Sequence, residues 1–195
     1  MAPALTHSRS NDELREFAHE HLVYEARMLV YAVAEMRGLR KGPERNAYLE
    51  SFAVHARCLR DFFWGKRDRK RKQEDAYAFD YCASGVWEAR YPEASMPRAL
   101  KNIDDRLRIG REVVHLSYRR LDVRGKGWHP QAVLREIAAP LDTLADLALP
   151  ARMDGPTRAA LRDPETFGRE AGAASVATGG SFAGTIPVAT SRFGR

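Results

Sequence analysis

Cysteine and long hydrophobic runs are both scarce in this chain of 195 residues. The two cysteines, Cys58 and Cys82, have no CxxC or Cys/His spacing, so a reduced, intracellular protein is the simpler interpretation. The longest mainly apolar stretch, 28–36, is too short to span a bilayer and contains Glu35. The first residues lack the apolar segment of a secretion signal. We therefore expect a cytoplasmic protein with no membrane partner.

Several sequence motifs that are typical of enzyme active sites are also absent from the chain. No glycine-rich loop that could cradle phosphates precedes a predicted helix, GxSxG does not occur, and nothing indicates a cysteine nucleophile. Strand-like alternation is nearly absent, and there are no internal repeats. We therefore expect helices throughout and no cofactor.

The composition that remains is that of a globular domain with a basic surplus. Hydrophobic residues make up 44% of the chain and charged residues 30%, which is enough apolar material for a core. The formal net charge is +6 and the pI about 9.5. A surplus of this size favours polyanionic partners without naming one.

Helical periodicity predicts an all-α, up-and-down four-helix bundle. The expected helices are listed by range: 12–37, 44–64, 97–120 and 130–148. Ser10 and Glu13 form a capping-box pattern before the first helix, Gly38 ends it, and Pro43 suits the first turn of the second. The short connection makes the first two helices antiparallel neighbours. Pro140 should kink the last helix.

The chain divides into three predicted regions. Residues 1–10 form a flexible N-terminus, and residues 11–150 form the bundle domain, which carries a surface loop insertion at 65–96 with a short helix expected around 83–90. Residues 151–195 are expected to form a low-complexity, disordered tail, because 171–195 are rich in Gly, Ala, Ser and Thr; the segment 156–163 is compatible with a short helix.

The third predicted helix carries the main candidate for chemistry. Arg108 and His115 are seven residues apart, so they leave one face about 10 Å apart along the axis. Arginine is shaped to grip phosphate, and histidine can transfer protons near neutral pH. Arg111 and Arg119 extend the same stripe as further binding residues. The alternative is a salt-bridged flank of an ordinary bundle.

Two residues on the first two helices are candidates for a supporting role. Glu25 occupies a core-facing position, where a carboxylate must be paired, and Arg or His from another helix is the expected partner. His55 flanks the apolar stripe of the second helix, either as a hydrogen-bonded core histidine or as a residue that orients His115. A metal or small-molecule site would require His21, Glu25, His55 and His115 to converge. Because HExxH and Glu-x-x-His pairs are absent, we expect no metal.

The insertion begins with KRDRKRK (66–72), a run of cations. Its charged residues are Lys66, Arg67, Arg69, Lys70, Arg71 and Lys72. They could track a phosphate backbone, with neighbouring aromatic residues stacking on exposed bases, or they could form a solvated loop.

The pairing of HARCLRDFF (55–63) with RIGREVVHLSYRR (108–120) resembles uncharacterised bacterial proteins with a HEPN-like helical bundle, over roughly residues 12–148. The signature of that superfamily is an arginine, four to six intervening residues and a histidine, and Arg108 and His115 enclose six. Ile109 and Gly110 differ from the polar residues common at these positions in active members.

The resemblance implies an RNA-binding protein of stress or phage defence that acts as a dimer and is a candidate metal-independent endoribonuclease. In that chemistry His115 would assist attack of the ribose 2′-hydroxyl, and Arg108 would hold the phosphate. It leaves a toxin–antitoxin or defence partner unidentified. The competing hypothesis is a non-enzymatic helical interaction or scaffold protein that binds a protein or nucleic-acid partner.

Overall fold

The computed structural model describes residues 9–65, 75–103, 109 and 128–164, and the structural statements below concern these residues. Every regular element among them is helical, which confirms the all-α class. None of the described helices has both the length and the apolar character that crossing a bilayer requires. Arg108, Arg111, His115, Arg119 and the run 66–72 lie outside the described residues.

The first helical run contains α1 (Asn11–Phe17), the π-helical turn η1 (Ala18–Leu22) and α2 (Val23–Glu35). Ser10 accepts a hydrogen bond from the Glu13 amide, and Glu13 accepts one from the Ser10 amide at 2.8 Å, so the predicted capping box is confirmed. The run is followed by Gly38, whose φ of 84° is the left-handed conformation that glycine favours after a helix. The predicted apolar stripe is buried, and its members are Ala18, Leu22, Leu29, Ala32 and Met36.

Helix α3 (Pro43–Trp64) packs antiparallel to α2, as the short connection predicts. The ring of Tyr24 meets that of His55 at 5.7 Å, and the ring of Tyr31 meets that of Tyr48 at 5.9 Å. A step of seven residues forward on α2 therefore matches a step of seven backward on α3. The core residues of α3 include Phe52, Ala56, Leu59 and Phe63.

The segment 75–96 confirms the short helix expected around 83–90 but corrects the prediction that the insertion lies on the surface. It contains η2 (Ala78–Asp80), α4 (Val86–Arg90) and η3 (Glu93–Ser95). Tyr81 is fully buried and its hydroxyl donates to the carbonyl of Leu14, while the indole of buried Trp87 donates to the carbonyl of Phe63. Large rings that can satisfy their polar atoms make this segment part of the core.

The next elements are α5 (Arg98–Ile103) and α6 (Pro130–Leu147). Glu136 of α6 accepts hydrogen bonds from the first amides of α5, at 3.1 Å from Leu100 and 3.4 Å from Ala99. The predicted helix 97–120 is confirmed for 98–103 and at Ile109, and its other positions lie outside the described residues. Helix α6 continues through Pro140, which is buried.

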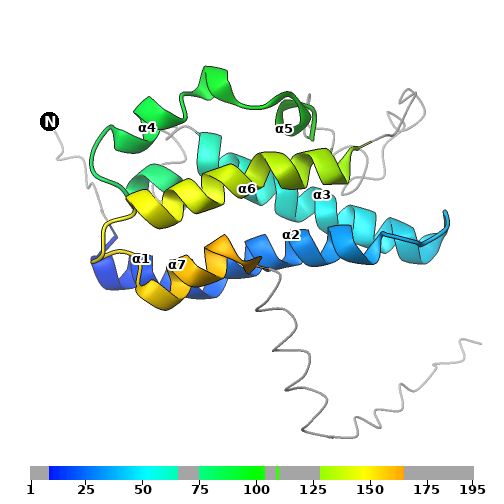
Figure 1. Ribbon diagram of the computed structural model, residues 1–195, viewed down its shortest axis with the longest axis horizontal. Coiled ribbons are helices and arrows are strands. Elements are labelled where there is room, and N and C mark those ends of the chain that lie inside the picture. The colour runs from blue at the N-terminus through cyan, green and yellow to red at the C-terminus, as the bar shows by residue number, and fades with distance from the viewer. Residues whose placement is uncertain (1–8, 66–74, 104–108, 110–127, 165–195) are drawn as a thin grey trace, which may run out of the picture.

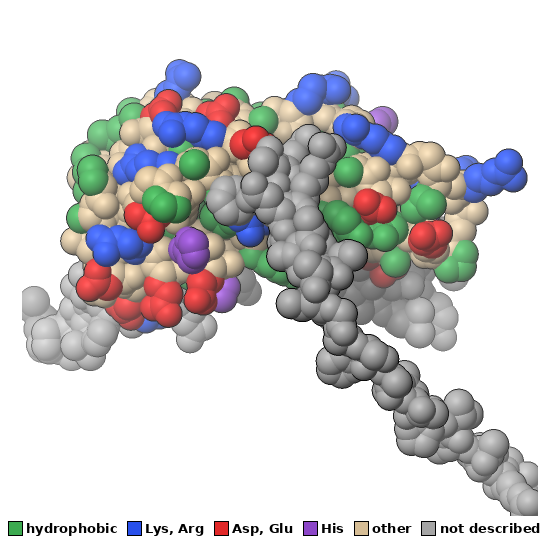
Figure 2. Space-filling view, turned by 60° about the horizontal axis from the view of Figure 1, so that its bottom comes forward, with side chains coloured by type: hydrophobic (Ala, Val, Ile, Leu, Met, Phe, Trp, Pro, Cys, Tyr) green, Lys and Arg blue, Asp and Glu red, His purple; other side chains and the backbone are tan. Residues whose placement is uncertain are grey.

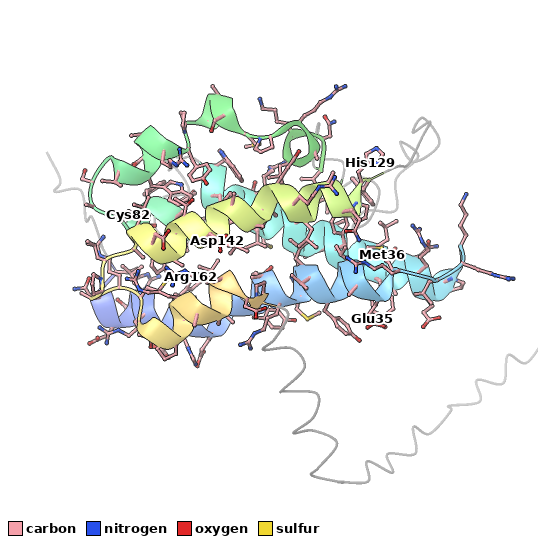
Figure 3. The ribbon with its side chains drawn as sticks, in the orientation of Figure 1. Glu35, Met36, Cys82, His129, Asp142 and Arg162 are labelled. Atoms are coloured by element: carbon pink, nitrogen blue, oxygen red, sulfur yellow. The ribbon has the colours of Figure 1, made fainter. Side chains whose placement is uncertain are left out.

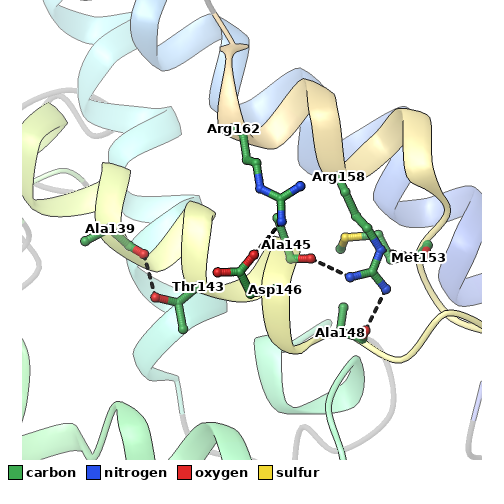
Figure 4. A network of polar contacts seen from close by, with 8 residues as sticks. All are labelled: Ala139, Thr143, Ala145, Asp146, Ala148, Met153, Arg158 and Arg162. Atoms are coloured by element: carbon green, nitrogen blue, oxygen red, sulfur yellow. Dashed lines mark hydrogen bonds and ion pairs between the residues drawn. The ribbon is translucent and has the colours of Figure 1, made fainter.

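Helix α7 (Gly155–Arg162) corrects the predicted domain boundary at 150. Asp154 caps its first turn by accepting from the Thr157 amide at 2.8 Å. The guanidinium of Arg158 donates to the carbonyls of Ala145, Ala148 and Met153, and Arg162 pairs with Asp146 (Figure 4). The helix itself was expected at 156–163, but its packing was not, and Met153, Thr157 and Leu161 are buried. The packed domain therefore extends through residues 151–164.

Figure 1 shows how these elements are layered. Helix α6 runs alongside α2 and α3, and α7 lies beside the first helical run. The segment with α4 and α5 covers the opposite side of α6 from α7. Glu35 and Met36, at the end of α2, lie at the same end of the molecule as His129, which precedes α6 (Figure 3).

We expect substitutions on α3 to separate core from surface. Phe52 is 0% exposed and Val54 is 40% exposed. Phe52→Ala should lower the free energy of unfolding by about 3–5 kcal/mol through lost burial and a cavity. Val54→Ala, on the outer face, should change it by less than about 0.5 kcal/mol. Urea unfolding followed by circular dichroism measures both, and equal effects would contradict the assigned faces.

Truncation tests the corrected boundary. A chain that ends at Pro164 should unfold within a few degrees of the full chain, because it keeps every residue of α7. A chain that ends at Pro150 should lose at least about 3 kcal/mol, because it deletes buried Met153 and Leu161. Thermal melts give the comparison, and equal melting temperatures for the two truncations would show that α7 is not part of the folded unit.

Candidate functional site

The best-defined polar pair in the described structure joins α2 and α3. The Nδ1 atom of His55 lies 2.8 Å from Oε2 of Glu25. The histidine side chain is 12% exposed and the carboxylate 27%, so the pair lies at the rim of the core with one side open to water. The ring of Tyr24 meets the imidazole edge-on. The prediction that Glu25 takes Arg or His from another helix is confirmed.

The local sequence explains why this pair forms. Glu25 falls between Leu22 and Leu29 in the apolar stripe of α2, so packing α2 on α3 carries its carboxylate toward the neighbouring helix. A half-buried carboxylate without a partner would cost free energy. The antiparallel register places His55 opposite it. The pair is thus imposed by the same packing that builds the core.

The geometry leaves His55 able to move a proton. When Nδ1 carries the hydrogen that Glu25 accepts, Nε2 is left as an acceptor, and the carboxylate fixes both the tautomer and the ring orientation. Such a pair can position another group or exchange a proton with a ligand. It is also stable without any ligand, as a satisfied rim interaction.

Cys58, one helical turn beyond His55, does not add a nucleophile. Partial burial, the negative charge of Glu25 and a hydrogen bond to it raise the pKa of the Cys58 thiol to about 11. Burial likewise raises the pKa of Cys82 to about 11. Because the thiolate is the reactive form, both side chains are protonated at neutral pH.

The π-helical turn η1 immediately precedes this site. Such turns inside α-helices occur frequently at functional sites. Within η1, His19 lies 3.3 Å from the hydroxyl of Thr157, and the ring of His21 lies 5.1 Å from that of Phe17. The turn therefore directs His19 toward α7 and sets His21 against Phe17 of α1.

Exposed aromatic rings occur along the first helical run. Phe17 is 36% exposed, Tyr24 51% and Tyr31 49%. Tyr24 and Tyr31 are seven residues apart within α2 and so follow one face, whereas Phe17 belongs to α1, on the other side of the π-helical turn. In Figure 2, hydrophobic side chains appear over part of the face in view, with Lys and Arg side chains at one tip of the molecule and Asp, Glu and His side chains toward the other.

A metal site has no support in the described ranges. They contain no group of three or more His, Cys, Asp or Glu side chains placed to hold an ion. His21 and Glu25 therefore have no described third ligand. The convergence of four residues considered from the sequence also needs His115, which lies outside the described residues.

Some of the predicted site residues are in contact in the structure, and others lie outside the described residues. Glu25 and His55 meet, whereas Arg108 and His115 and the other arginines of that stripe are not described. Ile109, the described residue next to Arg108 in the sequence, is 2% exposed and belongs to the hydrophobic core.

Sequence reasoning missed the tyrosines of the α2–α3 face as site residues. Tyr24 and Tyr31 were available as a seven-residue repeat beside the apolar stripe. Their partners, His55 and Tyr48, are also seven residues apart. Two equal steps on antiparallel helices predict two paired positions, and this signal could have located the face.

No protein-family model matches the chain, and comparisons with curated proteins and with solved structures also give no match.

Thiol reactivity tests the electrostatics of this site. In a Cys82→Ala background, Cys58 should react slowly with iodoacetamide at pH 7.5 and faster as the pH rises toward about 11. Glu25→Gln should accelerate the reaction at pH 7.5, because it removes a negative charge that opposes the thiolate; each unit of lowered pKa gives about tenfold more thiolate. Glu50→Gln is the control on the exposed surface of α3. An unchanged rate in Glu25→Gln would contradict the contact.

Proposed function

We propose that this chain is an RNA-binding protein on a HEPN-like four-helix bundle, and that it cleaves RNA without a metal ion. The observation that carries the proposal is the Glu25–His55 pair, a histidine held by a carboxylate at 2.8 Å at the open rim of the core. Exposed aromatic rings on the same side and the net charge of +6 support a polyanionic ligand with stacking bases.

In the proposed reaction, His115 takes the proton of a ribose 2′-hydroxyl as that oxygen attacks the adjacent phosphorus. The bond from phosphorus to the 5′ oxygen breaks, the leaving oxygen takes up a proton, and the products carry a 2′,3′-cyclic phosphate and a 5′-hydroxyl. Arg108 holds the phosphate and offsets its developing charge. These two roles rest on the HEPN-like resemblance, since both residues lie outside the described structure.

The remaining site residues support that reaction. His55, itself fixed by Glu25, is a positioning residue for His115, and Arg111 and Arg119 add contacts to neighbouring phosphates. A homodimer would bring two such helices to one cleft. The setting we propose is cytoplasmic defence against stress or phage.

A second candidate function is favoured by the exposed rings of Phe17, Tyr24 and Tyr31. Large exposed aromatic side chains are enriched at protein interfaces. On this alternative the protein is a non-enzymatic helical scaffold, and neither histidine has a chemical role.

Cleavage of labelled RNA discriminates between the two. The wild type should produce 2′,3′-cyclic phosphate ends in the presence of EDTA, and His115→Ala should reduce the rate at least about 100-fold, the lower end of the contribution of one acid–base group. Glu25→Gln should lower the rate by a smaller factor, because it only loosens a positioning residue. Circular dichroism confirms that each variant is folded.

The matched control is His129→Ala, which removes an exposed histidine that precedes α6. It should cleave at the wild-type rate. Absence of cleavage by the wild type on single-stranded RNA, duplex RNA and tRNA would refute the enzymatic proposal and favour the scaffold. Cleavage that His115→Ala leaves intact would refute the assigned base.

A further inference from the structure

The connection between α2 and α3 is a basic tip. Four cations fall within nine residues, namely Arg37, Arg40, Lys41 and Arg45. Glu35 and Glu44 offset two of them, which leaves four minus two, a net charge of +2 over 35–45. Within the described part of the chain, Arg40 and Lys41 are exposed and form no ion pair. Their charges are available to an anionic ligand.

A pair of tyrosines adjoins this tip. Tyr31, near the end of α2, meets Tyr48, near the start of α3, edge-on with ring centroids 5.9 Å apart. Tyr31 is 49% exposed, so much of its ring surface faces water. The neighbouring Tyr31 hydroxyl and the carboxylates of Glu35 and Glu44 raise the pKa of Tyr48, which keeps that phenol neutral. Neutral, partly exposed rings beside cations are the components of a base-stacking platform.

The platform continues along α2 to the candidate site. Tyr24 lies seven residues before Tyr31, about 10 Å along the helix axis, and is 51% exposed. Its ring contacts that of His55. The charge changes along this path, from cations at the tip to the acidic first turn of α1 with Asp12 and Glu13. The electrostatic attraction for a polyanion is therefore strongest at the basic tip of this face.

We propose that the α2–α3 face binds single-stranded RNA, with backbone phosphates on Arg40 and Lys41 and unpaired bases on Tyr31 and Tyr24. The bound strand runs from the tip toward Glu25 and His55. The inference deepens the proposed RNA-binding function and rests on it.

Two observations favour a single strand over other occupants of this face. Tyrosine rings reach the faces of unpaired bases, whereas a duplex keeps its bases stacked inside and offers only phosphates. The adjoining cations match a phosphate backbone by charge, which an apolar protein surface would not require. The occupant is therefore a chain that carries both phosphates and accessible rings.

The test is binding of a fluorescein-labelled, 2′-O-methylated 12-nucleotide RNA, followed by anisotropy with the full chain at several salt concentrations. Methylation blocks attack by the 2′ oxygen, so the measurement reports binding and not cleavage. The double variant Arg40→Glu/Lys41→Glu should lower affinity at least tenfold and reduce the slope of log affinity against log salt by about 1.4, since each phosphate contact on a single strand contributes about 0.7. The matched control, Arg98→Glu/Lys101→Glu, makes the same charge change on exposed residues of α5 and should retain more of the affinity.

The tyrosines are tested separately from the charges. Tyr31→Ala should weaken binding about fivefold or more, whereas Tyr31→Phe, which keeps the ring, should bind like the wild type. Tyr31 is 49% exposed, so both variants should keep the fold, which circular dichroism verifies. A duplex of the same length should bind with no dependence on Tyr31.

The possible outcomes distinguish an error in the proposed binding face from an error in the proposed RNA-binding function. Wild-type binding that survives both the Arg40/Lys41 and the Tyr31→Ala substitutions would overturn the proposed face and leave RNA binding intact. Loss of affinity to the same extent in the α5 control would show non-specific attraction and also overturn the face. A wild type that binds no RNA would refute the proposed function itself.

Discussion

The antiparallel packing of α2 on α3 is the constraint on which the rest of the structure depends. It buries the apolar stripes that carry Leu29 and Phe52, and it fixes the register that pairs Tyr24 with His55 and Tyr31 with Tyr48. Helices α5 and α6 then pack against this pair, and α7 joins α6 and α2. One register therefore determines both the core and the composition of the outer face.

The Glu25–His55 pair shows how a core requirement can produce a chemically competent group. Glu25 is carried into the α2 stripe by helical periodicity, and the cost of half-burying its charge selects a partner on α3. A histidine partner satisfies that requirement while keeping a second ring nitrogen, which arginine or lysine could not offer as an acceptor. Cys58, on the same face, is held protonated by burial and by the charge of that carboxylate. The contact with Glu25 consequently uses Nδ1 of His55 and leaves Nε2 outside it.

Much of the fold could be predicted from the sequence where periodicity is long and the capping residues are explicit. The helices that begin at Asn11, Pro43 and Pro130 lie within one or two residues of expectation, and the capping box at Ser10 formed as its residues predict. The prediction failed where burial depends on distant partners. Tyr81 and Trp87 lie in a segment without periodicity and are buried because they reach carbonyls of Leu14 and Phe63. The helix at 156–163 was expected only as part of a tail, because its packing depends on distant partners such as the α6 carbonyls that Arg158 binds.

The site was predictable only in part. The need for a partner on Glu25 follows from its position in one helix, but the identity of that partner requires the register between two helices. Locating the face that carries Tyr24 and Tyr31 likewise depends on the register between α2 and α3.

The π-helical turn η1 has a geometric consequence for the first helical run. A π-turn accommodates one extra residue, and one residue corresponds to about 100° of rotation in an α-helix. The azimuth of α1 is thereby offset from that of α2, which lets His19 reach α7 while α2 keeps its stripe on α3. Deleting a single residue here would restore an uninterrupted helix and turn the two halves out of phase, so the length of this segment, more than its composition, is what the surrounding architecture constrains.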